Sequence, residues 1–85
     1  MSIRILYFAS VRENLGTSEE MFEPGAPVSD VKSLRGQLIV RGGAWAATLA
    51  SGKAVRVSVN HDIARDHTPV KAGDEVAFFP PVTGG

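Results

Sequence analysis

Cysteine is absent from this 85-residue chain. Small secreted domains usually rely on disulfides because their cores are small, so the absence favours a reducing compartment, and we expect a cytoplasmic protein. The absence also removes any cysteine nucleophile and any cysteine-ligated metal site. His61 and His67 match no common ligand spacing, and we expect no metal site.

An excess of charge of either sign is also lacking. Nine basic and nine acidic residues give a formal net charge of zero, and no run of lysine or arginine occurs. Nucleic-acid-binding domains usually carry a clustered basic excess, and anionic membrane surfaces attract polybasic segments. No apolar stretch is long enough to span a bilayer, and the first residues do not resemble a signal peptide. We therefore expect neither a nucleic-acid nor a membrane partner.

The hydrophobic pattern predicts a single α+β domain. Alternating or continuous apolar runs predict strands at residues 3–8, 18–23, 55–59 and 75–79. The first and last of these strands are the most apolar. We expect them to lie side by side and parallel at the centre of a mixed sheet, where both faces are covered best.

Helices are predicted between these strands. A short one follows the first strand, with Ser10 as its N-cap, Glu13 as the capping-box partner and Gly16 at its end. The main helix is predicted to begin at Ser29 as N-cap. A third, short helix covers residues 44–50, with Trp45 as a large core anchor. The main helix has a buried stripe of Val31, Leu34 and Leu38, and a solvated side of Lys32, Arg35 and Gln37.

The most informative segment is the carboxyl end, where an apolar strand is followed by Pro80-Pro81-Val82-Thr83-Gly84-Gly85. Proline lacks an N–H donor, so the strand cannot continue as a paired ladder. Glycine has no Cβ, so its backbone fits a channel too narrow for other residues. We therefore divide the chain into a domain at residues 1–79 and a flexible tail at residues 80–85. This tail suits a carboxylate that is delivered into another protein's active site.

Several segments resemble the MoaD family, the small sulfur-carrier subunits of molybdopterin synthase. The whole segment from Gly73 to Gly85 resembles the carboxyl end of that family. The segment from Ile5 to Glu13, followed by Gly16, resembles its opening strand and turn. Val57-Ser58-Val59-Asn60 resembles its central strand. The resemblance covers essentially the whole chain and implies a β-grasp, ubiquitin-like fold with one main helix packed on one face of the sheet.

The resemblance also implies a function. Gly85, preceded by Gly84, would be adenylated by a MoeB-like enzyme that uses ATP and magnesium, and a sulfur-transfer protein would then convert it to a thiocarboxylate. The charged carrier would dock with a MoaE-like large subunit in a heterotetramer. There it would donate sulfur to cyclic pyranopterin monophosphate to form the molybdopterin dithiolene. The catalytic groups would lie on the large subunit, so the carrier itself would be non-catalytic and would bind no cofactor.

Partner contacts are predicted at two places. Pro80, Pro81, Val82 and Thr83 can be held as an extended peptide. An apolar surface beside the tail is expected at Phe8, Ile63 and Phe79, although Phe8 and Phe79 fit a core position equally well. Two alternative functions remain. One is a sulfur carrier for thiamin or amino-acid biosynthesis, and the other is a β-grasp interaction module whose carboxylate is never activated.

Overall fold

The computed structural model describes residues 1–50 and 54–81. Within them, five strands form one mixed sheet in the order β2-β1-β5-β3-β4. The central pair, β1 and β5, is parallel, whereas the other neighbours are antiparallel. The predicted α+β class and the predicted central pair are therefore confirmed. The elements are β1 (Ile3–Tyr7), α1 (Ala9–Leu15), β2 (Glu19–Phe22), α2 (Val31–Ile39), α3 (Gly43–Leu49), β3 (Arg56–Val59), β4 (Asp62–Ile63) and β5 (Glu75–Phe79).

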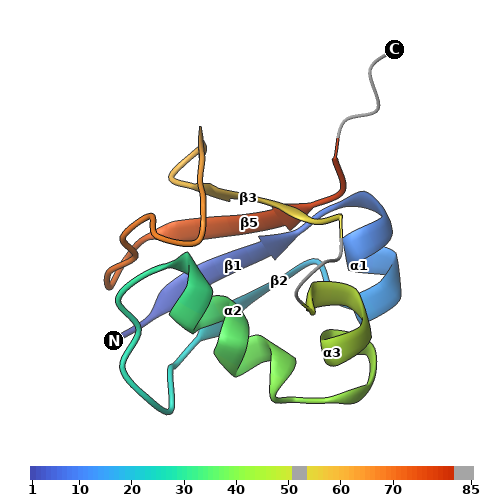
Figure 1. The fold of residues 1–85 in the computed structure, drawn as a ribbon, viewed down its shortest axis with the longest axis horizontal. Helices are drawn as coiled ribbons and strands as arrows, with labels where there is room; N and C mark the ends of the chain where they lie inside the picture. The colour runs from blue at the N-terminus through green and yellow to red at the C-terminus, as the bar shows by residue number, and fades with distance from the viewer. Residues whose placement is uncertain (51–53, 82–85) are drawn as a thin grey trace.

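The core lies on one face of this sheet. Helix α2 crosses that face, while α1 and α3 lie at the end where β1 and β5 finish (Figure 1). The predicted stripe of α2 is confirmed, because its three residues are fully buried. They pack with the inward-pointing residues of the central strands, which alternate with outward-pointing ones. The inward set is Ile3, Ile5 and Tyr7 of β1, Val57 and Val59 of β3, and Val76 and Phe78 of β5.

The start of α2 differs from the prediction. The N-cap is Asp30 rather than Ser29: its carboxylate accepts from the Ser33 N–H at 2.8 Å, and the Ser33 hydroxyl accepts from the Asp30 N–H at 3.1 Å. The loop before β5 supplies two more acceptors, the carbonyls of Asp66 and Thr68, for the first helical N–H groups. The first backbone N–H groups of a helix have no acceptor within the helix. In α2, two of them donate to carbonyls of a segment far away in the sequence, and the residues around Asp30 give no sign of this contact.

The start of α1 also differs. Its N-cap is Phe8, without a side-chain hydrogen bond, so the predicted Ser10 cap and Glu13 capping box are wrong. Phe8 remains extended because its N–H donates to the Phe78 carbonyl at 3.1 Å, which continues the β1–β5 pairing by one residue. The predicted end at Gly16 is confirmed, since this glycine adopts a left-handed conformation with φ 74° and donates to the Arg12 carbonyl.

Two side chains predicted to be solvated on α2 instead make structural contacts. Arg35 donates through Nε to the carbonyl of Leu49 at 2.6 Å and through Nη2 to that of Ala50 at 3.3 Å. A positive charge at these carbonyls stabilises the carboxyl end of α3. Gln37 bridges the loop after β2, accepting from the Gly25 N–H and donating to the Ala26 carbonyl. Helix α2 therefore organises the loops around it as well as the core.

The tryptophan is a partly buried anchor at the edge of the core, as the sequence predicted. The Trp45 ring meets the Tyr7 ring edge-on, with centroids 5.5 Å apart. The Arg41 guanidinium lies 4.4 Å from the Trp45 centroid and also reaches the Glu20 carboxylate. Together these contacts join α3 and the end of α2 to strands β1 and β2. None of the helices in the described part of the chain is long and apolar enough to cross a membrane.

Candidate docking site

The residues predicted from the sequence to contact a partner, Phe8, Ile63 and Phe79, lie on the face of the sheet opposite the helices. We call it the open face. Residues directly opposite each other in register share a face, and residues two apart along a strand share it too. Because Ile5 and Val76 point into the core, their neighbours along β1 and β5 point to the open face. The apolar members of this face at the end nearest Pro80 form what we call the apolar patch: Leu6, Phe8, Ile63, Ala77 and Phe79. Met21 of β2 shares the face but lies opposite Arg4, away from the tail.

Phe8 and Phe79 belong to this patch and not to the core. The sequence left this question open, since consecutive aromatic residues at both strand ends permit either assignment. The structure buries Tyr7 and Phe78 almost completely, so Phe8 and Phe79 point the other way. Phe8 is 47% exposed, and Phe79 is half-buried among its neighbours. An exposed phenylalanine beside another apolar side chain is typical of an interaction surface.

Ile63 lies on the same face, two strands away. In register it is opposite Ser58, which in turn is opposite Ala77 of β5. The Ile63 side chain is 71% exposed. A branched apolar residue at that exposure contributes little to the stability of the isolated chain, whereas its burial by a partner would be favourable by about 1.5–3 kcal/mol. The three residues nominated from sequence therefore lie on one surface.

The tail begins beside this patch. Pro80 directly follows Phe79 and is half-buried against a shallow hollow formed by α1, α3 and the segment before β3. Pro81 is half-buried as well. The predicted contact residues Val82 and Thr83, and the predicted sulfur-bearing end at Gly84 and Gly85, lie outside the described residues. The patch thus lies beside the point from which the tail continues.

A row of charges limits the patch at its other end. Arg4 of β1 contacts Glu19 at 3.0 Å and Glu75 at 3.7 Å, and His61 contacts Glu75 at 3.0 Å. Since Arg4 and Glu75 are opposite each other in register, this row crosses the sheet near the start of both central strands. The open face is therefore apolar beside the tail and, apart from Met21, charged away from it.

The turn between β3 and β4 is held by a buried carboxylate. Asp74 is 6% exposed and accepts from the Lys71 N–H at 2.8 Å and from Asn60 Nδ2 at 3.1 Å. Burial by itself raises the pKa of Asp74, but these two hydrogen bonds and the Lys71 charge outweigh it and keep the pKa below its usual value. Asn60 also accepts from the Glu75 N–H at 3.0 Å and adopts φ 51°. This carboxylate has a structural role in the loop.

The described residues present an apolar surface that suits the binding of a partner. In this part of the chain, no three acidic or histidine side chains come together where they could hold a metal ion. The most perturbed group is Tyr7, whose pKa is raised well above its usual value by burial and by the neighbouring Glu20 carboxylate. Its hydroxyl donates to Glu20 at 2.9 Å, beside the Trp45 ring and the Arg41 guanidinium. Sequence reasoning did not nominate Leu6, Ala77 or Arg56, although the strand alternation places all three on the open face.

A sequence model described as the ThiS family matches residues 5–85 of this chain. A curated molybdopterin synthase sulfur carrier subunit of Escherichia coli K12 is 42% identical over 83 residues, which are 98% of this chain and 99% of that protein. The resemblance to molybdopterin synthase sulfur carriers is thereby confirmed over almost the whole length.

Solved structures agree on the fold. A protein of Pyrococcus furiosus described as molybdopterin converting factor, subunit 1, is 25% identical and superimposes with a TM-score of 0.78, covering 96% of this chain and 99% of that chain. The complex of subunits 1 and 2 of a molybdopterin-converting factor from Helicobacter pylori contains a chain that is 22% identical, with a TM-score of 0.67 and full coverage of both chains. The predicted β-grasp fold is confirmed.

Proposed function

The chain belongs to the ThiS family, with molybdopterin synthase sulfur carrier subunits among its curated relatives, and from this premise we propose that it is the sulfur carrier of a molybdopterin synthase. The carboxyl group of Gly85 carries the sulfur, and Gly84 keeps the approach to it narrow. The acceptor is cyclic pyranopterin monophosphate, which becomes the molybdopterin dithiolene on a MoaE-like large subunit.

The chemistry requires no acid, base or metal on this chain. A free carboxylate is a poor acyl electrophile, so a MoeB-like enzyme with ATP and magnesium first couples it to AMP, with release of pyrophosphate. A sulfur nucleophile delivered by a sulfur-transfer protein then attacks the acyl carbon, and AMP leaves. The thiocarboxylate sulfur finally bonds to a carbon of the pterin, and water cleaves the resulting thioester, which restores the Gly85 carboxylate. A second charged carrier supplies the other sulfur of the dithiolene. The carrier contributes a deliverable carboxyl group and a surface that positions it.

The observation that carries this proposal is the position of the apolar patch. Phe8, Phe79 and Ile63 lie on one face, and Pro80 leaves β5 directly beside them. A partner that buries this patch holds the start of the tail at its own surface. Six residues from Pro80 to Gly85 span about 20 Å when extended, at roughly 3.3–3.6 Å per residue, which is enough to reach a buried active site. Docking and delivery are thereby coupled.

Two other functions remain to be separated from this one. A carrier for thiamin or amino-acid biosynthesis uses the same carboxyl chemistry but a different acceptor. A β-grasp interaction module uses the apolar patch but never activates its carboxylate. The curated molybdopterin synthase relatives favour the proposed pathway over both.

The test is a reconstitution with purified components. The chain is incubated with a MoeB-like enzyme, ATP, magnesium and a sulfur donor, and the carboxyl-terminal peptide is analysed by mass spectrometry. We expect the mass increase of one oxygen replaced by one sulfur, followed by dithiolene formation once a MoaE-like subunit and the cyclic pterin are added. Absence of the mass increase supports the interaction module. Charging without dithiolene formation supports a carrier for another pathway.

A further inference from the structure

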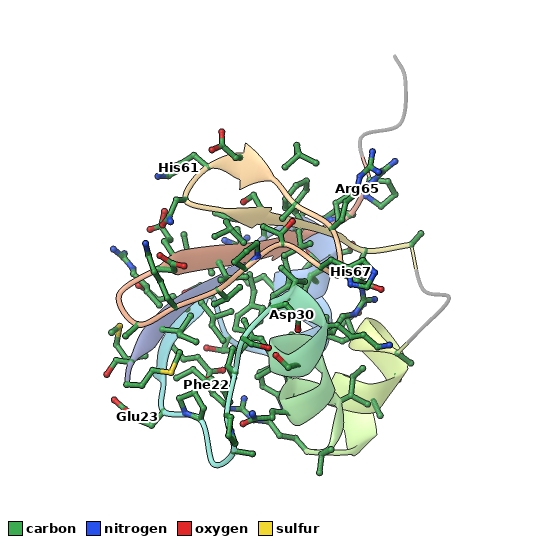
Figure 2. The ribbon with its side chains drawn as sticks, turned by 60° about the vertical axis from the view of Figure 1, so that its left-hand side comes forward. Phe22, Glu23, Asp30, His61, Arg65 and His67 are labelled. Atoms are coloured by element: carbon green, nitrogen blue, oxygen red, sulfur yellow. The ribbon has the colours of Figure 1, made fainter. Side chains whose placement is uncertain are left out.

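Two arginines border the apolar patch on the side of β3 and β4. Arg56 is directly opposite Phe79 in the β3–β5 register and is exposed. The Ala64 N–H donates to the Val57 carbonyl at 2.9 Å, which extends the β3–β4 ladder and places Arg65 at the next position, opposite Arg56. Figure 2 shows the Arg65 side chain at the end of the hairpin remote from His61, toward the end of the sheet where β5 finishes.

These arginines differ from the other charges of the open face. Arg4 is paired with Glu19 and Glu75. Among the described residues, by contrast, neither the Arg56 nor the Arg65 guanidinium makes an ion pair or a side-chain hydrogen bond. The acid next in sequence, Asp66, lines a groove with Lys32 and Arg35 of α2, the helix that covers the opposite face of the sheet (Figure 1).

Like charges at opposing positions of two strands are destabilising, and here the described part of the chain offers no compensation. A second chain with acidic groups facing Arg56 and Arg65 would compensate their charges. Charged groups bordering an apolar contact mainly determine which partner binds and how fast it associates. The arginines lie next to Phe79 and Ile63, so the same partner would meet both the apolar patch and the positive charge.

We propose that Arg56 and Arg65 form a partner-selecting site that pairs with acidic side chains of the large subunit, at the rim of the pocket that buries the apolar patch. The inference rests on the proposed function, because it names a contact with that partner. Favourable pairing lowers the dissociation constant at low salt and restricts binding to large subunits with an acidic rim. The apolar patch supplies the part of the affinity that does not depend on salt.

The experiment compares the full-length double variant Arg56→Gln/Arg65→Gln with the matched control Lys32→Gln/Lys71→Gln, which removes the same charge from exposed positions outside the open face. Binding to the large subunit of the same organism is measured by calorimetry between about 0.1 M and about 1 M salt, over which the screening length falls from about 10 Å to about 3 Å. Thermal unfolding of each variant is recorded in parallel.

We expect the arginine variant to bind the large subunit about tenfold more weakly at low salt, to lose most of its salt dependence, and to unfold no earlier than the parent. The control should keep the parent's affinity. Equal binding of the large subunit by the arginine variant and the parent, or an equal loss of affinity in the control, would overturn the proposal. Failure of the parent chain itself to bind the large subunit would instead count against the proposed function.

Discussion

Arg41 donates to both carboxylate oxygens of Glu20, at 2.9 and 2.8 Å, and so connects the segment after α2 to the edge strand β2. The hydrogen bonds from Arg41 are the main reason that the pKa of Glu20 lies below its usual value. The same guanidinium lies over the Trp45 ring. Arg41 thus combines a two-point ion pair with a cation–π contact, and its removal affects both.

Because Arg41 also contacts Trp45, removing Arg41 should lower the free energy of unfolding more than neutralising Glu20. We expect Glu20→Gln to lower the free energy of unfolding by less than about 1 kcal/mol, because the pair is partly exposed and the amide can still accept from Tyr7. Arg41→Ala should cost about 1–2 kcal/mol, since the ring contact is lost as well. Urea unfolding at neutral pH measures both. Equal losses would show that the contact with Trp45 contributes nothing.

Asp74 makes stability depend on pH in the acid range. Its pKa is lower in the folded chain than the usual value of about 3.9, so its contribution is complete above that value and is lost as pH falls through the folded pKa. Asp74→Asn should cost about 1–3 kcal/mol near neutral pH, because an amide cannot accept from both Lys71 and Asn60. The difference between variant and parent should stay constant above about pH 5 and shrink below about pH 4. A difference independent of pH down to the acid transition would contradict this account.

Two glycines should respond to alanine in opposite directions. Gly36 lies inside α2, and a Cβ there meets nothing within 4 Å, so Gly36→Ala should raise the free energy of unfolding by about 0.5–1 kcal/mol. Gly16 has φ +74° at the end of α1, so Gly16→Ala should lower it by about 1 kcal/mol although the space is equally open. Thermal or urea unfolding distinguishes the two. The same sign for both changes would refute the conformational explanation.

The apolar patch should matter for binding and little for stability. Phe8→Ala and Ile63→Ala remove exposed side chains, so each should change the free energy of unfolding by no more than about 0.5 kcal/mol. Each should raise the dissociation constant for the large subunit about tenfold or more, as expected for buried apolar anchors of an interface. Val40→Ala, at a residue 84% exposed at the end of α2, is the control and should leave binding unchanged.

The tail should tolerate no side chain at its end. Gly85→Ala and Gly84→Ala are expected to slow charging or sulfur transfer, because a Cβ obstructs a channel that fits glycine. Gly25→Ala is the matched control: it lies in the loop after β2, where a Cβ meets nothing within 4 Å. All three should unfold like the parent. Thiocarboxylate formation, followed by mass spectrometry, should be impaired only in the tail variants, and normal charging and transfer in both of them would refute the prediction.

The sequence by itself determined which residues form the core, where the spacing of apolar residues favours a strand or a helix, and the Gly-Gly end. These features are local: an apolar period of two or of three to four, or a proline after a strand, has its physical consequence within a few residues. The stripe of α2 and the end of α1 at Gly16 were predicted correctly for that reason. The central pair β1–β5 joins distant segments, and it was predicted because these two strands are the most apolar and are covered best at the centre of a sheet. The family resemblance rested on the same short segments.

Only the tertiary structure decided which of two adjacent aromatic residues faces the partner and where the charges gather. Alternation places Phe78 and Phe79 on opposite faces, but the helices determine which face is covered. The register of β3 against β5 brings Arg56 beside Phe79, and the loop before β5 helps to set the start of α2 at Asp30. Such relationships join residues far apart in the chain. They depend on how whole elements pack, which no short sequence pattern contains.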